Sequence, residues 1–291
     1  MAYYLDWSTD GADWPNRPAS RFVEAHGMRW HVQVMGRGPV LLLLHGTGAS
    51  THSWRDVLPK LAAHYTVVAP DLPGHAFSNP PAKQSLSLPG MAAGVAALLR
   101  KLELSPVRAA GHSAGAAILV RMAVERLIAP KDIISFNGAF FPVSGVAGTF
   151  FSPLAKAAAG ASLIAKMFAR MADRKSVERL LRETGSKIDE RGISLYQRLF
   201  SNEAHVAGTL GMMAAWDLHW VSQDLRNLPT TLYLVRASND RTIKPTEAAK
   251  AVKLVPDGVI LDMPGLGHLA HEEDPSTAAN LIASPETAFL R

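Results

Sequence analysis

The sequence predicts an α/β fold in which a mostly parallel, doubly wound sheet carries a helical cap inserted between its two halves. Strand-like apolar runs alternate with helical patterns from residue 40 to residue 136, the order that produces a parallel sheet. Residues 138–222 show only loop and helical periodicity, and the strand–helix alternation resumes at residue 230. A strand-free stretch between two halves of a sheet predicts an insertion that covers the ends of the strands.

Each element of the first half has its own signal. Residues 1–20 hold tryptophans and prolines without a clear period, which predicts an extended N-terminal segment that its tryptophans attach to the core. Residues 21–25 and 28–35 alternate around a glycine, as in an antiparallel hairpin. The apolar run at 40–44 is bounded by turns and predicts a strand buried on both faces. The patterns that follow predict a helix at 53–64, a strand at 65–69, a helix at 88–102, a short strand from 107 and a strand at 132–136.

The second half of the sheet is shorter. Its patterns predict a strand at 230–236, a helix at 246–255, a strand at 258–263 and a C-terminal helix. We therefore divide the chain into an N-terminal segment (1–20), a first core part (21–137), a helical cap (138–222) and a second core part (223–291).

The composition narrows the chemistry. Cysteine is absent, which excludes disulfides, thiolate catalysis, zinc–thiolate sites and iron–sulfur clusters. The net charge of +5 is modest and comes without an arginine-rich arm, so it does not indicate a nucleic-acid partner. The N-terminus lacks the basic region and apolar core of a signal peptide, and a cytoplasmic protein is expected.

The strongest motif is Gly-His-Ser-Ala-Gly at residues 111–115, between a short strand and an apolar helix. Small residues on both sides of Ser113 let the strand and the helix pass close together around a strained serine. Such a turn points the serine hydroxyl outward. It also leaves the amide of Ala114 at a helix N-terminus, where partial positive charge gathers. The motif predicts a nucleophile elbow.

A nucleophilic serine needs a base within reach, and the base needs an acceptor that fixes its tautomer. Asp240 follows the strand predicted at 230–236, and His268 follows the strand predicted at 258–263. Both therefore lie at the carboxyl edge of the sheet, where the elbow also emerges. We predict Ser113 as nucleophile, His268 as base and Asp240 as the acid that orients the base.

Other histidines compete with His268 for the role of base. His112 adjoins the serine but should point away from it, whereas His75 could line the floor of the pocket. His271 lies about a helical turn beyond His268, which favours a surface residue or one that supports the site. The spacing from His268 to Glu272 is not that of a metalloprotease, so no metal site is expected. Nucleotide binding is improbable because Gly46-Thr47-Gly48 lacks a third glycine.

Several motifs together resemble the α/β-hydrolase superfamily. This resemblance implies a Ser–His–Asp triad, an oxyanion hole made by the amides of Thr47 and Ala114, and no cofactor. Ala76 departs from the pattern, because glycine is usual there, and this puts the local turn in doubt. The motifs are His45-Gly46-Thr47-Gly48, Asp71-Leu72-Pro73-Gly74-His75, the elbow, Asn239-Asp240-Arg241 and Gly267-His268.

A narrower similarity is to the magnesium-chelatase accessory hydrolases of bacteriochlorophyll biosynthesis. It implies a tetrapyrrole such as a porphyrin as the small molecule, a phototrophic setting and a functional link to magnesium chelatase. The residues that carry it are Trp7, Asp13-Trp14-Pro15, Ser20-Arg21-Phe22-Val23 and, above all, the stretch from Leu44 to Asp56.

The cap and the loops around the elbow should form the binding site for a hydrophobic molecule. The expected pocket residues are His45, Gly46, His75, His112, Phe140, Phe141 and Trp216. Apolar residues recur at helical spacing at Leu154, Ala158, Ala161, Ile164, Phe168 and Met171. They predict a cap helix packed on the core. The basic residues between Lys156 and Lys175 leave open a second interpretation, a peripheral contact with anionic lipid.

Three functions remain open at the level of sequence. The first is hydrolysis of an ester or related carbonyl group on a tetrapyrrole-like molecule. The second is non-catalytic binding of a porphyrin and its delivery to magnesium chelatase. The third is an unrelated esterase or carbon–carbon bond hydrolase.

Overall fold

An eight-stranded sheet forms the centre of the computed structural model, which describes residues 4–78, 86–142 and 162–289. The strand order is β1-β2-β4-β3-β5-β6-β7-β8. The strands are β1 (Ser20–Ala25), β2 (Met28–Met35), β3 (Val40–Leu44), β4 (Thr66–Pro70), β5 (Pro106–His112), β6 (Asp132–Phe136), β7 (Thr231–Ala237) and β8 (Gly258–Met263).

The sheet is mostly parallel, as predicted. β1 pairs with β2 and β2 with β4 in antiparallel fashion, whereas every pairing from β4 across to β8 is parallel. The carboxyl ends of β3, β5, β6, β7 and β8 therefore meet at one edge of the sheet. In a doubly wound fold this is the edge where ligands bind.

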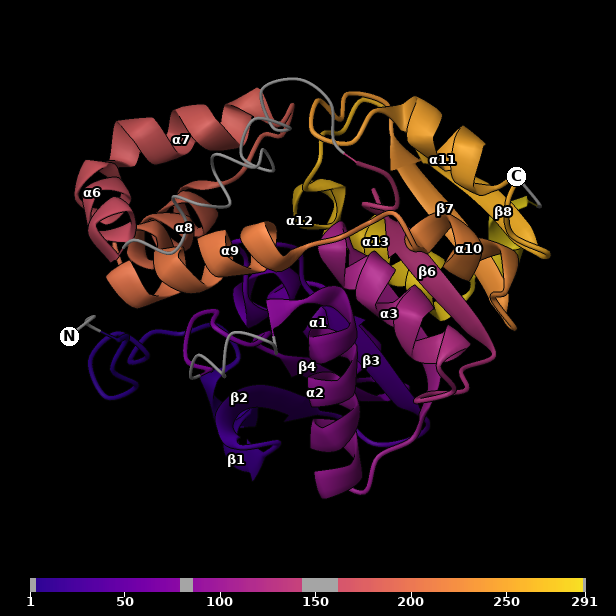
Figure 1. The fold of residues 1–291 in the computed structure, drawn as a ribbon, viewed down its shortest axis with the longest axis horizontal. Helices are drawn as coiled ribbons and strands as arrows, with labels where there is room; N and C mark the ends of the chain where they lie inside the picture. Colours follow the sequence, from indigo (N-terminus) through magenta and orange to yellow (C-terminus); the bar gives the residue numbers. More distant parts are fainter. Residues whose placement is uncertain (1–3, 79–85, 143–161, 290–291) are drawn as a thin grey trace.

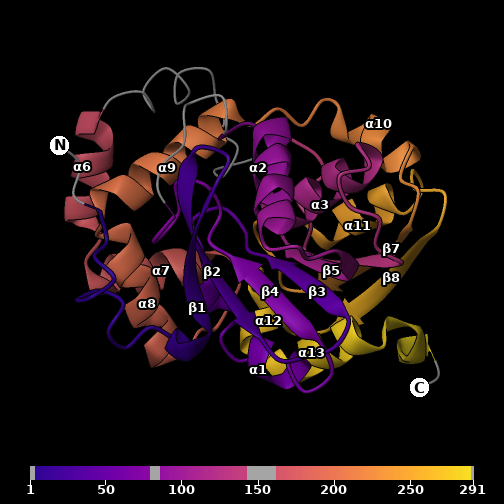
Figure 2. The ribbon, with the colours of Figure 1, turned by 90° about the horizontal axis from the view of Figure 1, so that it is seen from below.

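Helices cover both faces of the sheet (Figure 2). α2 and α3 lie on one face, and α1 and α13 lie on the other. The helices are η1 (Arg17–Ala19), η2 (Thr51–Trp54), α1 (Leu58–Leu61), α2 (Leu88–Lys101), α3 (Ala114–Val124), α6 (Ser162–Met171), α7 (Arg174–Glu183), α8 (Glu190–Phe200), α9 (Glu203–Ala215), α10 (Val221–Arg226), α11 (Pro245–Ala251), α12 (Ala270–Glu273), α13 (Pro275–Ala283) and η4 (Pro285–Phe289).

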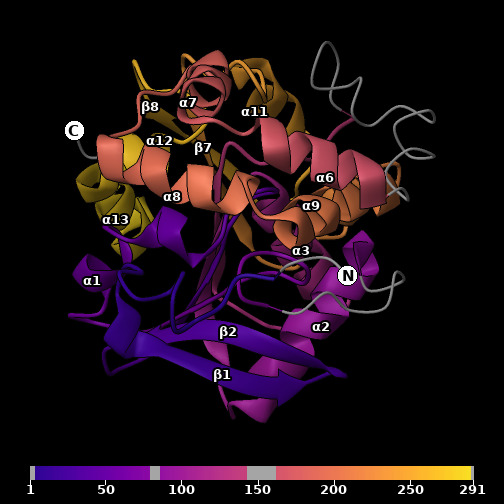
Figure 3. The ribbon, with the colours of Figure 1, turned by 90° about the vertical axis from the view of Figure 1, so that its left-hand side faces the viewer.

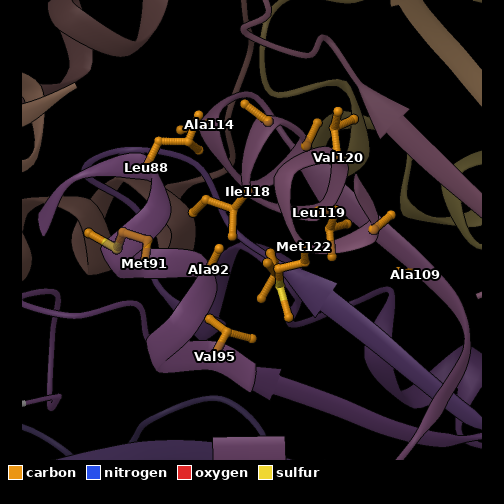
Figure 4. Packing of buried hydrophobic residues seen from close by; sticks show 14 of the residues in the cluster. Leu88, Met91, Ala92, Val95, Ala109, Ala114, Ile118, Leu119, Val120 and Met122 are labelled. Atoms are coloured by element: carbon orange, nitrogen blue, oxygen red, sulfur yellow. The ribbon is translucent and has the colours of Figure 1, made fainter. Parts of the chain in front are cut away.

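The larger core cluster lies where α2 and α3 pack together. Ala92 and Val95 of α2 lie in one buried cluster with Ile118 and Met122 of α3 and Ala109 of β5 (Figure 4). Full burial of each of the larger side chains stabilises the fold by roughly 1.5–3 kcal/mol. This packing fixes α3, and α3 in turn fixes the elbow at its N-terminus.

Helices α6–α9, which we call the cap, gather on one side of the molecule, opposite β1 and β2 (Figures 1 and 3). In the described part of residues 138–222 there is no strand, in agreement with the sequence pattern. The expected boundary at residue 222 falls inside α10, which packs against α3 of the core. None of the described helices combines the length and the apolar character that a bilayer crossing requires.

The predicted packing face of α6 is wrong. Ala165 and Ala169 form the buried face and pack with Val206 of α9. Phe168 and Met171, which were expected to pack on the core, are 41% and 65% exposed. The small side chains let α6 and α9 approach each other, and the large apolar ones are left on the outside. The predicted positions 154, 158 and 161 lie outside the described residues.

The helix predicted at 53–64 is broken into two short turns, η2 and α1. Pro59 has no amide proton, so it cannot donate to the carbonyl group of Arg55 as a continuous α-helix requires. The side-chain amide of Asn16 donates to that carbonyl instead, at 3.0 Å. A contact from the N-terminal segment thus replaces one helical hydrogen bond.

The N-terminal segment is folded into turns rather than extended. The Asp6 carboxylate accepts hydrogen bonds from the amides of Ser8 and Thr9, and the amide of Asp10 donates back to the Asp6 carbonyl. Trp14 is buried beside Leu195 and Leu199 of α8. The Trp14 indole also donates to the Thr51 hydroxyl of the core, as expected of a segment attached by its tryptophans. The contact with the cap was not predicted.

Candidate active site

Ser113 lies in a strained turn between β5 and α3. Its backbone angles are φ 51° and ψ −114°, in a region that residues with a side chain rarely adopt. A methyl group at Gly111 would lie 2.5 Å from the Ala116 amide nitrogen, and one at Gly115 would lie 2.3 Å from the Leu44 carbonyl oxygen. Both approaches are too close for a side chain. The elbow therefore has the predicted geometry, and its two glycines are steric requirements.

His268 and Asp240 form a pair at the same edge of the sheet. The distance from His268 Nδ1 to Asp240 Oδ2 is 2.8 Å, and the Asp240 side chain is completely buried. The other carboxylate oxygen accepts hydrogen bonds from the amides of Thr242 and Ile243 at 2.7 and 2.8 Å. These bonds hold the carboxylate in place. They leave Nε2 of His268 as the ring nitrogen available to a substrate or nucleophile.

Ser113 and His268 are linked through His112. The His112 ring lies 4.6 Å from the His268 ring, and its Nε2–H donates to the His268 carbonyl oxygen at 2.9 Å. Within the described residues the Ser113 hydroxyl makes no hydrogen bond to His268. Such contacts are often long in the absence of substrate and tighten when it binds. Ser113 is 9% exposed and His268 7%, so both side chains are largely buried.

The two predicted oxyanion-hole amides lie beside the serine. A methyl group at Gly46 would lie 3.1 Å from Ser113 Cβ, which places the loop after β3 directly against the elbow. The amide of Ala114 begins α3. Neither the Thr47 nor the Ala114 amide donates a hydrogen bond within the described part of the chain. Two free amides next to a serine can stabilise a negatively charged oxygen.

Three histidines that were expected to line the pocket are instead buried beneath the loops of the site. His45 accepts a hydrogen bond from the Leu72 amide at Nε2, at 2.8 Å, and is fully buried. The His75 ring lies 5.3 Å from the His45 ring and is equally covered. His112 is 2% exposed. These side chains do not form an open pocket wall, because all three are buried. Within the described residues, Nε2 of His75 and Nδ1 of His112 have no hydrogen-bond partner.

His271 is also placed differently from the sequence-based expectation of a surface residue. It is fully buried, between the Trp54 ring at 4.4 Å and the His112 ring at 4.5 Å. Among the residues that the structure describes, neither ring nitrogen of His271 has a hydrogen-bond partner. Its alternative role as a support for the site remains compatible with this position.

Of the three aromatic pocket residues, Phe140 and Phe141 line a hollow beside the elbow, whereas Trp216 does not. The amide of Ala139 donates to the Ser113 carbonyl oxygen, so the chain passes from the elbow directly to Phe140. Trp216 is 6% exposed and packs in the main core cluster. The residues that line the hollow are Phe140, Phe141, Pro142, Arg241, Thr242, Ile243, Lys244 and Glu247.

Two residues of the site were not recognised as supports in the sequence. The side-chain amide of Asn137 donates to the carbonyl groups of Gly267 and His268 and accepts from the Ala237 amide. Nδ1 of His205 in α9 accepts a hydrogen bond from the Ala76 amide, and its Nε2–H donates to the Gly48 carbonyl oxygen. In the sequence, the position of Asn137 after a core strand was the only feature that could have indicated this role. No sequence feature indicated it for His205.

Burial controls the protonation of the groups around the site. It lowers the pKa of His112 well below its usual range and that of His205 to about 4, so both are neutral at physiological pH. Burial also raises the pKa of Glu272 to about 7, although Arg55 and the Tyr196 hydroxyl favour its carboxylate form. Within the described residues, no group of three or more histidine or acidic side chains could hold a metal ion.

The sheet, the strained serine and the buried histidine–carboxylate pair define the chain as an α/β hydrolase by architecture. Comparison with known proteins agrees. The family model described as "Alpha/beta hydrolase family" matches residues 41–280, and the chain belongs to that family.

Among curated relatives, the chain is similar to the magnesium-chelatase 30 kDa subunit of Rhodobacter capsulatus. The two are 36% identical over 264 residues, which cover 90% of this chain and 92% of the relative. The pyrrolizixenacetamide deacetylase of Xenorhabdus hominickii is 27% identical over 257 residues, which cover 86% of this chain and 91% of that protein. The first similarity agrees with the narrower resemblance carried by the sequence.

Among solved structures, an α/β hydrolase fold protein from Burkholderia ambifaria superposes with a TM-score of 0.76. The alignment covers 97% of this chain and 99% of that structure at 22% identity. At this level of identity the likeness concerns the fold alone.

Proposed function

We propose that this chain is a serine hydrolase that uses Ser113, His268 and Asp240 as its triad. The observation that carries the proposal is the 2.8 Å bond between His268 Nδ1 and the buried Asp240 carboxylate, at the edge where the strained Ser113 emerges. The bond fixes the imidazole tautomer that leaves Nε2 free to accept a proton. A serine next to such a base is an activated nucleophile.

The reaction proceeds in two steps. Ser113 Oγ attacks the carbonyl carbon of an ester while His268 Nε2 takes the hydroxyl proton. The amides of Thr47 and Ala114 stabilise the resulting oxyanion. The intermediate expels the alcohol, which receives the proton from His268, and an acyl-serine remains. Water then attacks the acyl carbon with His268 again as base. The acid leaves, and Ser113 regains its proton.

The substrate class rests on similarity and on the hollow beside the elbow. The relative named as a magnesium-chelatase subunit supports a tetrapyrrole-like substrate and a functional link to magnesium chelatase. Phe140, Phe141, Pro142 and Ile243 are the apolar residues that line the hollow. Arg241 and Lys244 line it as well, and neither has an acidic partner within the described residues. An acidic substituent of such a molecule would meet these two cations, next to the Glu247 carboxylate that lines the same hollow.

The first test labels the purified protein with a fluorophosphonate and reads the intact mass. We expect one adduct on the wild type and none on Ser113→Ala, with turnover of an activated ester lost in the same variant. Ser276→Ala, an exposed serine on α13, serves as the matched control and should label normally. Labelling or turnover that persists in Ser113→Ala would refute the assignment.

A second candidate function is porphyrin binding and delivery without turnover. The hollow with its two cations favours it as much as it favours hydrolysis. Quenching of tryptophan fluorescence by a porphyrin dicarboxylate, compared with its dimethyl ester, measures the binding. Tight binding of the dicarboxylate together with an unlabelled Ser113 would select this function. An unrelated esterase or carbon–carbon bond hydrolase would label at Ser113 and bind neither porphyrin.

A peripheral membrane contact is proposed for the outer face of α6. Met167, Phe168 and Met171 are 51%, 41% and 65% exposed, and basic residues lie on the same short helix and on α7. Exposed apolar side chains with flanking cations suit an anionic lipid surface. Flotation with anionic vesicles at low salt should recover the wild type but less of a Phe168→Glu, Met171→Glu variant. Equal recovery of both proteins would exclude this face.

A further inference from the structure

The linker between α7 and α8, residues 184–189, runs along both loops that carry the base and the acid. The carbonyl oxygen of Thr184 accepts hydrogen bonds from the amides of Arg241 and His268, at 3.1 and 3.3 Å. Arg241 follows the acid Asp240 directly. One carbonyl group of the cap is thus bonded to the backbone of both catalytic loops.

The contact between the linker and these loops is backbone against backbone. A methyl group at Gly185 would lie 2.0 Å from the Asn239 carbonyl oxygen, and one at Gly267 would lie 2.4 Å from the Ser186 amide nitrogen. Gly185 also has a φ of +89°, a conformation that favours glycine. The three segments therefore touch without intervening side chains, and none of them can move without displacing the others.

Two side chains complete the contact. Ser186 is buried, and its hydroxyl oxygen accepts the Leu269 amide at 2.9 Å, one residue after His268. The Glu273 carboxylate accepts the Gly267 amide with one oxygen at 2.8 Å and the Lys187 amide with the other at 2.9 Å. The backbone on both sides of His268 is thereby bonded to the linker or to a carboxylate that bridges to it.

We infer that Ser186 is a positioning residue for His268, and that the cap linker is part of the support of the triad. The inference rests on the proposed function for its kinetic consequence. Ser186 does not touch the substrate or the reacting atoms. Its hydroxyl oxygen accepts a hydrogen bond from the Leu269 amide, and this bond fixes the backbone that orients the His268 ring. A displacement of about 1 Å in such a group can lower a rate by about a hundredfold.

The experiment compares Ser186→Ala with the wild type and with Ser194→Ala. Ser194 is an exposed serine on α8 whose hydroxyl donates to the Glu190 carbonyl oxygen, away from both loops. We expect the rate of fluorophosphonate labelling to fall about tenfold or more in Ser186→Ala. With an activated ester, kcat should fall while KM stays near the wild-type value. Ser194→Ala should match the wild type in both measurements.

A second readout does not depend on turnover. The low-field proton resonance of the His268–Asp240 hydrogen bond, assigned by its absence in Asp240→Asn, should broaden or disappear in Ser186→Ala and persist in Ser194→Ala. An unlabelled wild type would remove the serine-hydrolase proposal, and this resonance would then decide the positioning role alone.

The inference is overturned if Ser186→Ala keeps the wild-type labelling rate and resonance. A lower melting temperature with both of these unchanged would mean a structural role only and would overturn it as well. If Ser186→Ala does not fold, Glu273→Gln takes its place. Glu273 is partly exposed, and the substitution would remove one of the two hydrogen bonds that its carboxylate accepts from the amides of Gly267 and Lys187. It should then show the same changes to a smaller degree, and their absence would count against the inference.

Discussion

At the scale of single residues, Ala76 shows how a strained position can be held by a distant side chain. Its φ is 44°, a left-handed conformation that costs an alanine roughly 1–2 kcal/mol. Its amide donates to Nδ1 of His205 in α9 at 3.0 Å, which holds the turn against the cap. The alanine that departs from the family pattern thus adopts the conformation for which glycine is the usual residue.

Ala76→Gly should therefore leave the free energy of unfolding unchanged or raise it by up to about 1 kcal/mol, because relief of strain offsets the added chain entropy of glycine. Denaturant unfolding measures the difference. The control is Ala96→Gly, in the interior of α2, which should lose about 1 kcal/mol or more. An equal loss at both positions would contradict the strain argument.

The same scale explains which site residues the sequence could predict. The positions of Ser113, Asp240 and His268 could be predicted because each residue follows a strand that ends at one edge of the sheet. The roles of His45 and Asn137 were not, because they depend on backbone groups of Leu72 and His268 that only the folded chain brings near. A histidine beside the elbow looks the same in the sequence whether it faces a ligand or a buried amide.

At the scale of elements, the strands were predictable and the packing of the cap was not. The expected ranges 40–44, 132–136 and 258–263 coincide with β3, β6 and β8. β3 is an uninterrupted apolar run, as is usual for a strand within a parallel sheet, and β6 and β8 are mostly apolar with one or two polar residues. On α6, periodicity marked a face but could not tell which face has a partner. The close approach of α9 selected the alanines.

α9 lies close to the loops of the site at Gly208, and a substitution at this position tests the contact. A methyl group there would lie 1.9 Å from the Gly74 carbonyl oxygen, so Gly208→Ala must displace α9. We expect a loss of about 1–3 kcal/mol in the free energy of unfolding, despite the better helix propensity of alanine. Urea unfolding measures it, and fluorophosphonate labelling should slow in parallel.

Gly211→Ala is the matched control, since it lies on the same helix. A methyl group at Gly211 meets only the end of the Leu86 side chain, at 2.8 Å, which can rotate away. This variant should be as stable as the wild type or more so. If the two variants behave alike, α9 is not fixed by its approach to Gly74.

At the scale of the whole molecule, six of the eleven histidines are buried with lowered pKa values, and their combined titration should govern acid stability. They surround the loops of the candidate site and the cap contact, so we expect this edge of the sheet to be sensitive to acid. These histidines are His45, His52, His75, His112, His205 and His271.

The sign of the effect follows from linkage. In the unfolded chain these histidines take up protons near pH 6.5, whereas in the fold burial keeps them neutral to lower pH, to about 4 for His205. The stability they support is complete above pH 6.5 and is lost as the pH falls toward 4. Glu272 acts in the opposite sense, because its raised pKa adds stability at low pH that is lost as the pH rises toward 7. Burial also raises the pKa of Asp224, so two carboxyl groups oppose six imidazoles, and the net effect is loss on acidification.

We therefore expect the free energy of unfolding to fall steeply between pH 6.5 and pH 4.5, with each buried histidine contributing up to about 1.4 kcal/mol per pH unit. Urea unfolding at several pH values measures the slope. His271→Leu should reduce this slope by the contribution of about one proton taken up on unfolding. Within the described residues both ring nitrogens of His271 lack hydrogen-bond partners, so the change breaks no hydrogen bond. His64→Leu, at an exposed position, should leave the slope unchanged. A stability that does not vary with pH across this range would mean that the histidines around the site become charged without unfolding the protein, and that the functional edge is more open to water than its packing indicates.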